Sequence, residues 1–180
     1  DSAKVAVQYR DRGVVGFDLA GDESGHPPAD HNEAFQFLRK KNFNITIHAG
    51  EAFGLSSIWQ AIQHCGAHRI GHATRLIEDD TVPGDHRGTL GEYILDHRIP
   101  LEMCLSSNLH TGAVTDLKEH PFPRYLREGY RVALNVDNTL MSQTTLTREW
   151  QLAQKLFSLE NSDFERIAIN AVKGAFCDHS

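Results

Sequence analysis

The sequence predicts an α/β fold in which about five strand–helix units follow one another, as in part of a (β/α)8 barrel. Short β-branched segments alternate with amphipathic helical segments along the 180 residues, the pattern of a parallel sheet covered by helices. No glycine-rich phosphate loop follows any of these strands, which disfavours an open doubly wound sheet, the alternative architecture. A polar residue ends each predicted strand, 24 to 34 residues after the one before: Asp18, His48, His72, Ser106 and Asp137.

In the first half of the chain, a 3.6-residue apolar period predicts helices and β-branched runs predict strands. The elements in order are a helix ending at Gly13, a strand over 14–19, a turn over 20–23, a helix over 31–42, a strand over 44–48, a helix capped by Ser56 and ended by Gly66, and a strand over 69–72. Right-handed crossovers between parallel strands place all their carboxyl ends on one edge of the sheet.

The second half continues the alternation after a predicted polar loop over 78–88. Its elements are a helix around Leu90 and Ile94, a strand over 100–105, a short helix with Pro123 in its first turn that stops near Gly129, a strand over 131–135, an amphipathic helix over 146–157, and a last helix with a capping box of Ser162 and Glu165. A full barrel needs about 250 residues and eight strands. We therefore expect the C-terminal five-eighths of a barrel.

The amino-acid composition limits the kinds of partner that the protein can have. Hydrophobic residues at 40%, a net charge of −6 and a pI near 6.0 indicate an ordinary globular protein, and argue against a nucleic acid or an anionic membrane as its main partner. No apolar run reaches the ~18 residues of a membrane span. Three cysteines without a CxxC pair support neither a disulfide framework nor a zinc knuckle, so we expect a cytoplasmic, reducing setting.

The strand ends carry the predicted chemistry. His48, His72 and Asp137 would meet at one edge of the sheet, together with Glu51, three residues beyond His48. Imidazole and carboxylate groups form a ligand set suited to zinc. Zinc lowers the pKa of a bound water toward ~7, and a carboxylate such as Glu51 could then move a proton.

Each of these residues also has a structural explanation. A histidine at a strand end is more often a hydrogen-bonded structural group than a ligand, and Asp18 or Asp137 could simply cap a turn. Cys104 lacks a neighbouring base and is expected in the core, while Ser106 lacks the G-x-S-x-G elbow of a hydrolase nucleophile. The prediction of a zinc site therefore rests on the expected meeting of these residues at one edge of the sheet, and not on any single residue. We expect nine further histidines to face solvent: His26, His31, His64, His68, His86, His97, His110, His120 and His179.

Four segments resemble the ordered signature blocks of the adenosine deaminase family. They are residues 17–23 (FDLAGDE), 46–51 (TIHAGE), 69–72 (RIGH) and 134–138 (LNVDN), and the Ser106–Ser107–Asn108 segment resembles the block of the family's seventh strand. The resemblance extends over nearly the whole chain. It implies a TIM barrel of the metal-dependent hydrolase type, of which residues 1–180 would be the C-terminal portion of a single domain.

The resemblance also implies roles for individual residues. His48 and Asp137 would be ligands of one Zn²⁺ ion, with Asp18 as a supporting carboxylate beside them. Glu51 would protonate the purine N1 while water adds to C6. His72 would orient or deprotonate that water and stabilise the developing charge.

Two positions would contact the purine. Gly21 would offer its backbone N–H to N3, where the absence of a Cβ allows close approach. Asn138 stands where the family usually has a second Asp; because N7 is an acceptor, the Asn amide can donate to it without being protonated. We expect Asn138→Leu to lower kcat/KM. Ala73 and Leu105 also depart from the family, where Gly and Pro are common.

The largest departure is the family's His-x-His pair, which supplies two more zinc ligands and has no match in this chain. His48 and Asp137 alone fall below the three protein ligands of a catalytic zinc site. With three strands also missing, we expect a fragment that, if it exists alone, binds zinc weakly and lacks activity.

The implied function is zinc-dependent hydrolytic deamination of adenosine and deoxyadenosine to inosine and ammonia, a step of purine metabolism with a small nucleoside as partner. Alternatives are deamination of adenine or another 6-aminopurine, a catalytically inactive barrel relative, and a barrel hydrolase acting on a cyclic amide. The intact His48, Glu51, His72 and Asp137 argue against an inactive relative. The sequence leaves the oligomeric state open.

Overall fold

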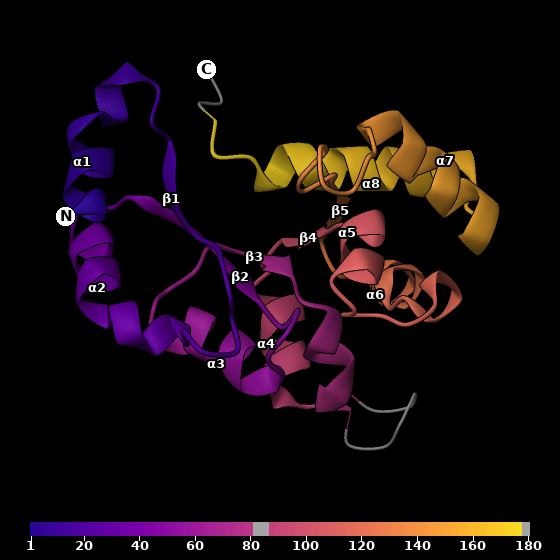
Figure 1. Ribbon diagram of the computed structural model, residues 1–180, viewed down its shortest axis with the longest axis horizontal. Coiled ribbons are helices and arrows are strands. Elements are labelled where there is room, and N and C mark those ends of the chain that lie inside the picture. The colour runs from indigo at the N-terminus through magenta and orange to yellow at the C-terminus, as the bar shows by residue number, and fades with distance from the viewer. Residues whose placement is uncertain (81–86, 178–180) are drawn as a thin grey trace.

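The computed structural model describes residues 1–80 and 87–177 and contains a parallel sheet of five strands (Figure 1). The strands are β1 (Gly16–Leu19), β2 (Asn44–Ala49), β3 (Arg69–His72), β4 (Leu101–Met103) and β5 (Val132–Leu134), and they lie side by side in sequence order. A doubly wound sheet would reverse its strand order at a switch point. The sequential order therefore confirms a partial barrel.

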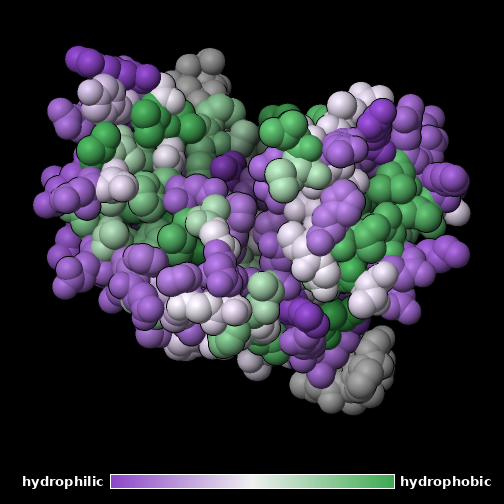
Figure 2. Space-filling model, in the orientation of Figure 1, coloured by the Kyte–Doolittle hydropathy of each residue, from purple (hydrophilic) through white to green (hydrophobic). Residues whose placement is uncertain are grey.

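Helices connect the strands. They are α1 (Ser2–Gln8), α2 (Asn32–Lys40), α3 (Leu55–Gln63), α4 (Thr89–Asp96), α5 (Leu105–His110), α6 (Phe122–Glu128), α7 (Leu146–Phe157) and α8 (Asn161–Gly174). Short 3₁₀ helices span Arg10–Arg12, Pro28–His31, Thr74–Asp79 and Leu117–Glu119. In Figure 1, α1 and α2 lie at the β1 end of the sheet, while α7 and α8 lie at the β5 end. Figure 2 shows a surface hollowed between these two ends. Among the described helices, none has the length and apolar character needed to cross a bilayer.

The core forms where apolar faces meet. On β2, the side chains of Ile45, Ile47 and Ala49 are fully buried; they point to one face of the strand, the face on which α2 and α3 pack. On α3, Ile58 and Ala61 are fully buried, so the predicted apolar face of this helix is confirmed. Gly129, with φ +90°, ends α6 in a left-handed conformation, as the sequence predicts.

Strand register brings the predicted site residues to one edge. Ala49 pairs with His72 across β2 and β3, and His48 lies opposite Gly71. A Cβ on Gly71 would lie only 2.8 Å from Cδ2 of His48, so glycine at this position lets the imidazole lie against β3. The shared edge predicted for the strand ends is confirmed.

Some predicted boundaries are wrong. The fourth strand ends at Met103, and Ser106, Ser107 and Asn108 lie on helix α5 instead of ending a strand. The Glu149 carboxylate of α7 accepts hydrogen bonds from the backbone N–H and the hydroxyl of Ser106, and these contacts hold the first turn of α5. Of the predicted loop over 78–88, residues 81–86 lie outside the described residues, and Glu78 and Asp79 end a 3₁₀ helix.

Two predicted helix caps are also wrong. α3 begins after Gly54, so Ser56 lies inside its first turn. The capping box of α8 uses Glu160 and Asp163 in place of Ser162 and Glu165. In both cases the helix begins earlier than the sequence pattern indicates. For α8, Glu160 already has the extended conformation of a cap, with φ −92° and ψ 170°.

Candidate metal and catalytic site

Four of the predicted site residues line one pocket at the carboxyl edge of the sheet. This pocket has a volume of about 230 Å³, and its walls include Asp18, His48, His72 and Asp137. Each comes from a different strand–helix unit, which explains why residues so far apart in sequence meet. Glu102 of β4 lines the same pocket.

His48 lies at the end of β2 between two other site residues. Its Nε2 is 3.4 Å from Oδ2 of Asp18, and this hydrogen bond raises the pKa of His48. Its ring meets the ring of His72 edge-on, with 4.8 Å between the centroids. Asp18 therefore lies beside the predicted ligand His48.

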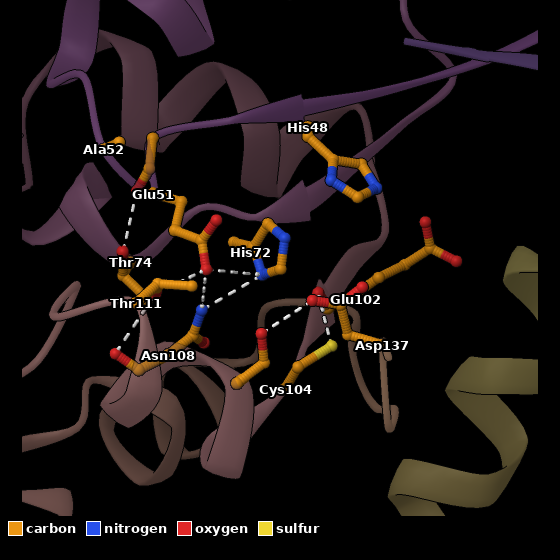
Figure 3. A network of polar contacts seen from close by, with 12 residues as sticks. His48, Glu51, Ala52, His72, Thr74, Glu102, Cys104, Asn108, Thr111 and Asp137 are labelled. Atoms are coloured by element: carbon orange, nitrogen blue, oxygen red, sulfur yellow. Dashed lines mark hydrogen bonds and ion pairs between the residues drawn. The ribbon is translucent and has the colours of Figure 1, made fainter. Parts of the chain in front are cut away.

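Glu51 and His72 share a hydrogen-bond network with α5. Oε1 of Glu51 lies 3.6 Å from Nδ1 of His72. Between them, Nδ2 of Asn108 lies 2.9 Å from that oxygen and 3.0 Å from that nitrogen, and the Thr111 hydroxyl donates to the same oxygen at 2.9 Å. His72 is only 2% exposed, and this burial lowers its pKa. Figure 3 shows Glu51 and Asn108 on one side of His72, and His48 and Asp137 on the other.

The loop that carries Glu51 is held by a buried carboxylate. Glu23, only 7% exposed, accepts hydrogen bonds from four successive backbone N–H groups, those of residues 50–53. The Oε2 distances are 2.9 Å to Glu51 N, 2.6 Å to Ala52 N and 3.1 Å to Phe53 N. Sequence reasoning placed Glu23 only in a turn. A charged residue within the FDLAGDE segment was the available signal for this role.

Asp137 is also held from α5. The Ser107 hydroxyl donates to Oδ2 of Asp137 at 2.6 Å. The helix itself is anchored by Glu149 of α7, a 1% exposed carboxylate that accepts from the Ser106 backbone N–H at 3.1 Å and from the Ser106 hydroxyl. The hydroxyl of Thr144 donates to the same carboxylate at 2.6 Å. Sequence reasoning missed the roles of Ser107 and Glu149, because the contacts join segments about 30 and 43 residues apart.

Strand ends at the site adopt an uncommon backbone conformation. His72, Ala73 and Asp137 have φ values of +68°, +52° and +54°, in the left-handed region. Such residues concentrate at functional sites, where surrounding contacts hold them in place. The left-handed conformation of Ala73 also explains why glycine is common there in the family.

The two predicted purine contacts lie in different surroundings. Gly21, with φ +141°, lines a second pocket of about 170 Å³ that also includes His48. Asn138 follows Asp137 and is exposed; its Oδ1 accepts from the backbone N–H groups of Leu140 and Met141 at 3.1 and 3.0 Å. The carbonyl half of the Asn138 amide is thus engaged in the turn, which leaves the NH₂ half as the part suited to donate to a ligand.

The prediction that His120 faces solvent is wrong. His120 is 2% exposed, its Nε2 lies 3.1 Å from Oδ1 of Asn108, and burial lowers its pKa to about 3. No signal in the sequence distinguished it from the other histidines. His86 and His179 lie outside the described residues, and the other six are exposed as predicted: His26, His31, His64, His68, His97 and His110.

The cysteine prediction holds. Cys104 is 4% exposed, and burial raises the pKa of its thiol, which disfavours the nucleophilic thiolate.

The donor chemistry fits zinc, but the number of donors is incomplete. His48 and Asp137 are an imidazole and a carboxylate in one pocket. Within residues 1–80 and 87–177, no three His, Cys, Asp or Glu side chains form a group that could hold a metal ion. His48 and Asp137 thus offer two donors of a kind that suits zinc, fewer than the three protein ligands that a catalytic zinc site requires.

Comparison with known proteins identifies the family. The adenosine deaminase family model matches residues 1–180. An adenosine deaminase of Mycolicibacterium gilvum is 50% identical over 177 residues, which cover 97% of this chain and 49% of that protein. The chain thus spans about half the length of the curated relatives it matches.

Solved structures share the fold. The N6-mAMP deaminase of Arabidopsis superposes with a TM-score of 0.85 at 28% identity, covering 99% of this chain and 50% of that one. An amidohydrolase of Burkholderia ambifaria with bound zinc superposes with a TM-score of 0.83 at 18% identity, covering 99% of this chain and 49% of that one. With the whole chain matched by the family model, this chain belongs to the adenosine deaminase family.

Proposed function

We propose that the protein containing this chain is a zinc-dependent aminohydrolase that converts adenosine and deoxyadenosine to their inosine products and ammonia. The observation that carries the proposal is the meeting of His48, Glu51, His72 and Asp137 at one edge of the sheet. Support comes from 50% identity to a protein named adenosine deaminase. We further propose that residues 1–180 are the C-terminal portion of a single barrel domain, and that the protein works in the cytoplasm.

His48 and Asp137 would hold the single zinc ion, together with ligands from outside the described residues. When bound, zinc acts as a Lewis acid that lowers the pKa of water and so provides a nucleophile at neutral pH. Asp18 lies 3.4 Å from His48 and would support its orientation.

Glu51 is the proposed proton donor to the purine N1. Its carboxyl group is oriented by two donors, the Asn108 amide and the Thr111 hydroxyl, both 2.9 Å from Oε1. His72 lies beside Glu51 and faces the pocket, where it would act on the attacking water and on the charge that develops at C6.

Two further groups would read the purine ring. Gly21 would donate its backbone N–H to N3 from the neighbouring pocket, and the Asn138 NH₂ group would donate to N7. These contacts recognise a purine base rather than a sugar. They are therefore compatible with a second candidate, the deamination of adenine or another 6-aminopurine compound, which the likeness to the N6-mAMP deaminase at 28% identity favours.

The test is a spectrophotometric assay of the intact purified protein with adenosine, deoxyadenosine, adenine, AMP and a cyclic amide. We expect the highest kcat/KM with the two nucleosides and about one zinc per chain. Glu51→Gln should lower kcat/KM by about 10² to 10⁴, the contribution of a positioned acid–base group. The matched control is Glu33→Gln, at an exposed position of α2.

Each other outcome points elsewhere. Higher activity on adenine or AMP would select the second candidate, and hydrolysis of the cyclic amide alone would assign a different reaction. Absence of any turnover by zinc-loaded intact protein would leave an inactive barrel relative.

A further inference from the structure

We propose that Asn108 and His120 are positioning residues that hold neutral His72 in one tautomer, with its proton on Nε2. The inference follows from the direction of four linked hydrogen bonds. It concerns two side chains that are 0% and 2% exposed; the roles proposed above use Asn108 only to orient Glu51 and do not use His120.

The chain of bonds starts at a group that can only donate. The backbone N–H of Phe122 lies 3.1 Å from Nδ1 of His120, so this nitrogen must present a lone pair. The proton of neutral His120 is therefore on Nε2. Burial lowers the pKa of His120 to about 3, which keeps the ring neutral at physiological pH.

His120 then orients the Asn108 amide. Its protonated Nε2 donates to Oδ1 of Asn108 over 3.1 Å. At the other end of the amide, Nδ2 donates to Oε1 of Glu51 over 2.9 Å. This oxygen can only accept when Glu51 is ionised, and also when Glu51 carries its proton on Oε2. Both neighbours therefore require the same orientation of Asn108, which removes the usual ambiguity between the two amide atoms.

The second hydrogen of the Asn108 NH₂ group determines the state of His72. Nδ2 lies 3.0 Å from Nδ1 of His72. Since an amide NH₂ cannot accept, Nδ1 of His72 must present a lone pair, and its proton is on Nε2. Figure 3 shows Nδ1 on the Asn108 side and the other ring nitrogen toward His48.

The catalytic consequence rests on the proposed function. With its proton on Nε2, neutral His72 donates a hydrogen bond to the oxygen that adds to C6 and stabilises the charge there. The same nitrogen has no lone pair with which to deprotonate water. The network thus selects the stabilising role over the deprotonating one.

The test is the tautomer itself, measured by NMR on the intact protein with ¹⁵N-labelled histidine rings. Two-bond couplings distinguish a protonated ring nitrogen from one with a lone pair. His68 provides an internal reference, because its Nδ1 accepts from the backbone N–H of Ile45 at 3.0 Å, near the opposite end of β2. We expect His68, His120 and His72 all to carry their proton on Nε2.

Variants test the direction of the relay. Asn108→Asp presents only acceptor atoms to His72 and should place a proton on its Nδ1. His120→Phe removes the donor to Asn108 and should leave His72 as a mixture of tautomers, whereas His120→Gln keeps a donor and should preserve the single state. An unchanged His68 signal shows that each variant is folded.

A proton on Nδ1 of wild-type His72, or an Asn108→Asp variant with an unchanged His72 tautomer, would overturn the inference. The deamination assay is separate. The expected tautomers in a protein without turnover would refute only the proposed function, and turnover with the opposite tautomer would refute only the relay.

Discussion

Replacing Glu23 with Gln should destabilise the protein and impair the site together, because this one carboxylate holds the loop that carries Glu51. Oε1 accepts from the Gly50 N–H, and Oε2 accepts from the N–H groups of residues 51–53. Glutamine keeps one oxygen and replaces the other with an NH₂ group. At best, three bonds survive without the charge and the fourth becomes a contact between two donors.

The size of the effect follows from these four bonds. Hydrogen bonds to a charged group contribute about 1.5–3 kcal/mol and neutral ones about 0.5–1.5 kcal/mol, so each surviving bond weakens by about 1 kcal/mol. The buried N–H left without an acceptor adds a further cost of about 1–3 kcal/mol. We expect a loss of about 4–6 kcal/mol in the free energy of unfolding, a large part of the 5–15 kcal/mol typical of proteins.

Urea unfolding of the intact protein measures this loss, with Glu33→Gln as the control for an exposed glutamate. A shift of Glu51 by about 1 Å should also lower kcat/KM by about 10². If Glu23→Gln unfolds within about 0.5 kcal/mol of the control and keeps full activity, the carboxylate does not hold this loop.

Three other perturbations have defined outcomes. Gly50→Ala should lower the free energy of unfolding in urea by about 2–4 kcal/mol, because φ is +74° and the added Cβ would clash with the side chain of Ile58 on α3. Gly112→Ala is the control, since φ is +77° there and no atom lies within 4 Å of the added Cβ. Equal losses in the two variants would contradict the clash. Ser107→Ala should weaken zinc binding by about 10- to 100-fold in a chelator competition, because Asp137 loses the hydrogen bond that the Ser107 hydroxyl donates to it at 2.6 Å. An unchanged zinc affinity would show that this hydrogen bond does not support Asp137 as a ligand. The pKa of His120 is about 3 in the folded state and about 6.5 in the unfolded state, so between these pH values only the unfolded state binds the proton. The free energy of unfolding therefore falls by about 1.4 kcal/mol for each pH unit as the pH drops through this window. His120→Gln should remove this one-proton contribution from the measured dependence of stability on pH, and an unchanged slope would refute it.

The sequence predicts the parts of the fold that depend on local patterns. The five strands and the long apolar helix faces follow from the period of buried residues, and Gly129 ends α6 because glycine adopts a left-handed conformation without cost. The meeting of His48, His72 and Asp137 follows from the shared edge of parallel strands. These features need no knowledge of side-chain contacts.

What the sequence could not predict depends on packing between distant segments. Nothing near His120 distinguishes it from an exposed histidine; its burial arises because the turn before α6 lies against Asn108 of α5. Glu23 likewise looks like a turn residue until the loop after β2 places four N–H groups around it. Ser107 was assigned to a strand end, since the helical start at Leu105 depends on tertiary contacts.

Helix α7 links the outside of the molecule to the site. Its Glu149 carboxylate holds Ser106, and the next residue on α5, Ser107, holds Asp137. The path from α7 to the predicted metal ligand Asp137 thus consists of the side chains of Glu149, Ser106 and Ser107. Displacement of α7, by a substitution on its exposed face or by a molecule bound there, would be transmitted through this short path. Helix α7, which does not line the pocket, thus helps to fix the position of Asp137 within it.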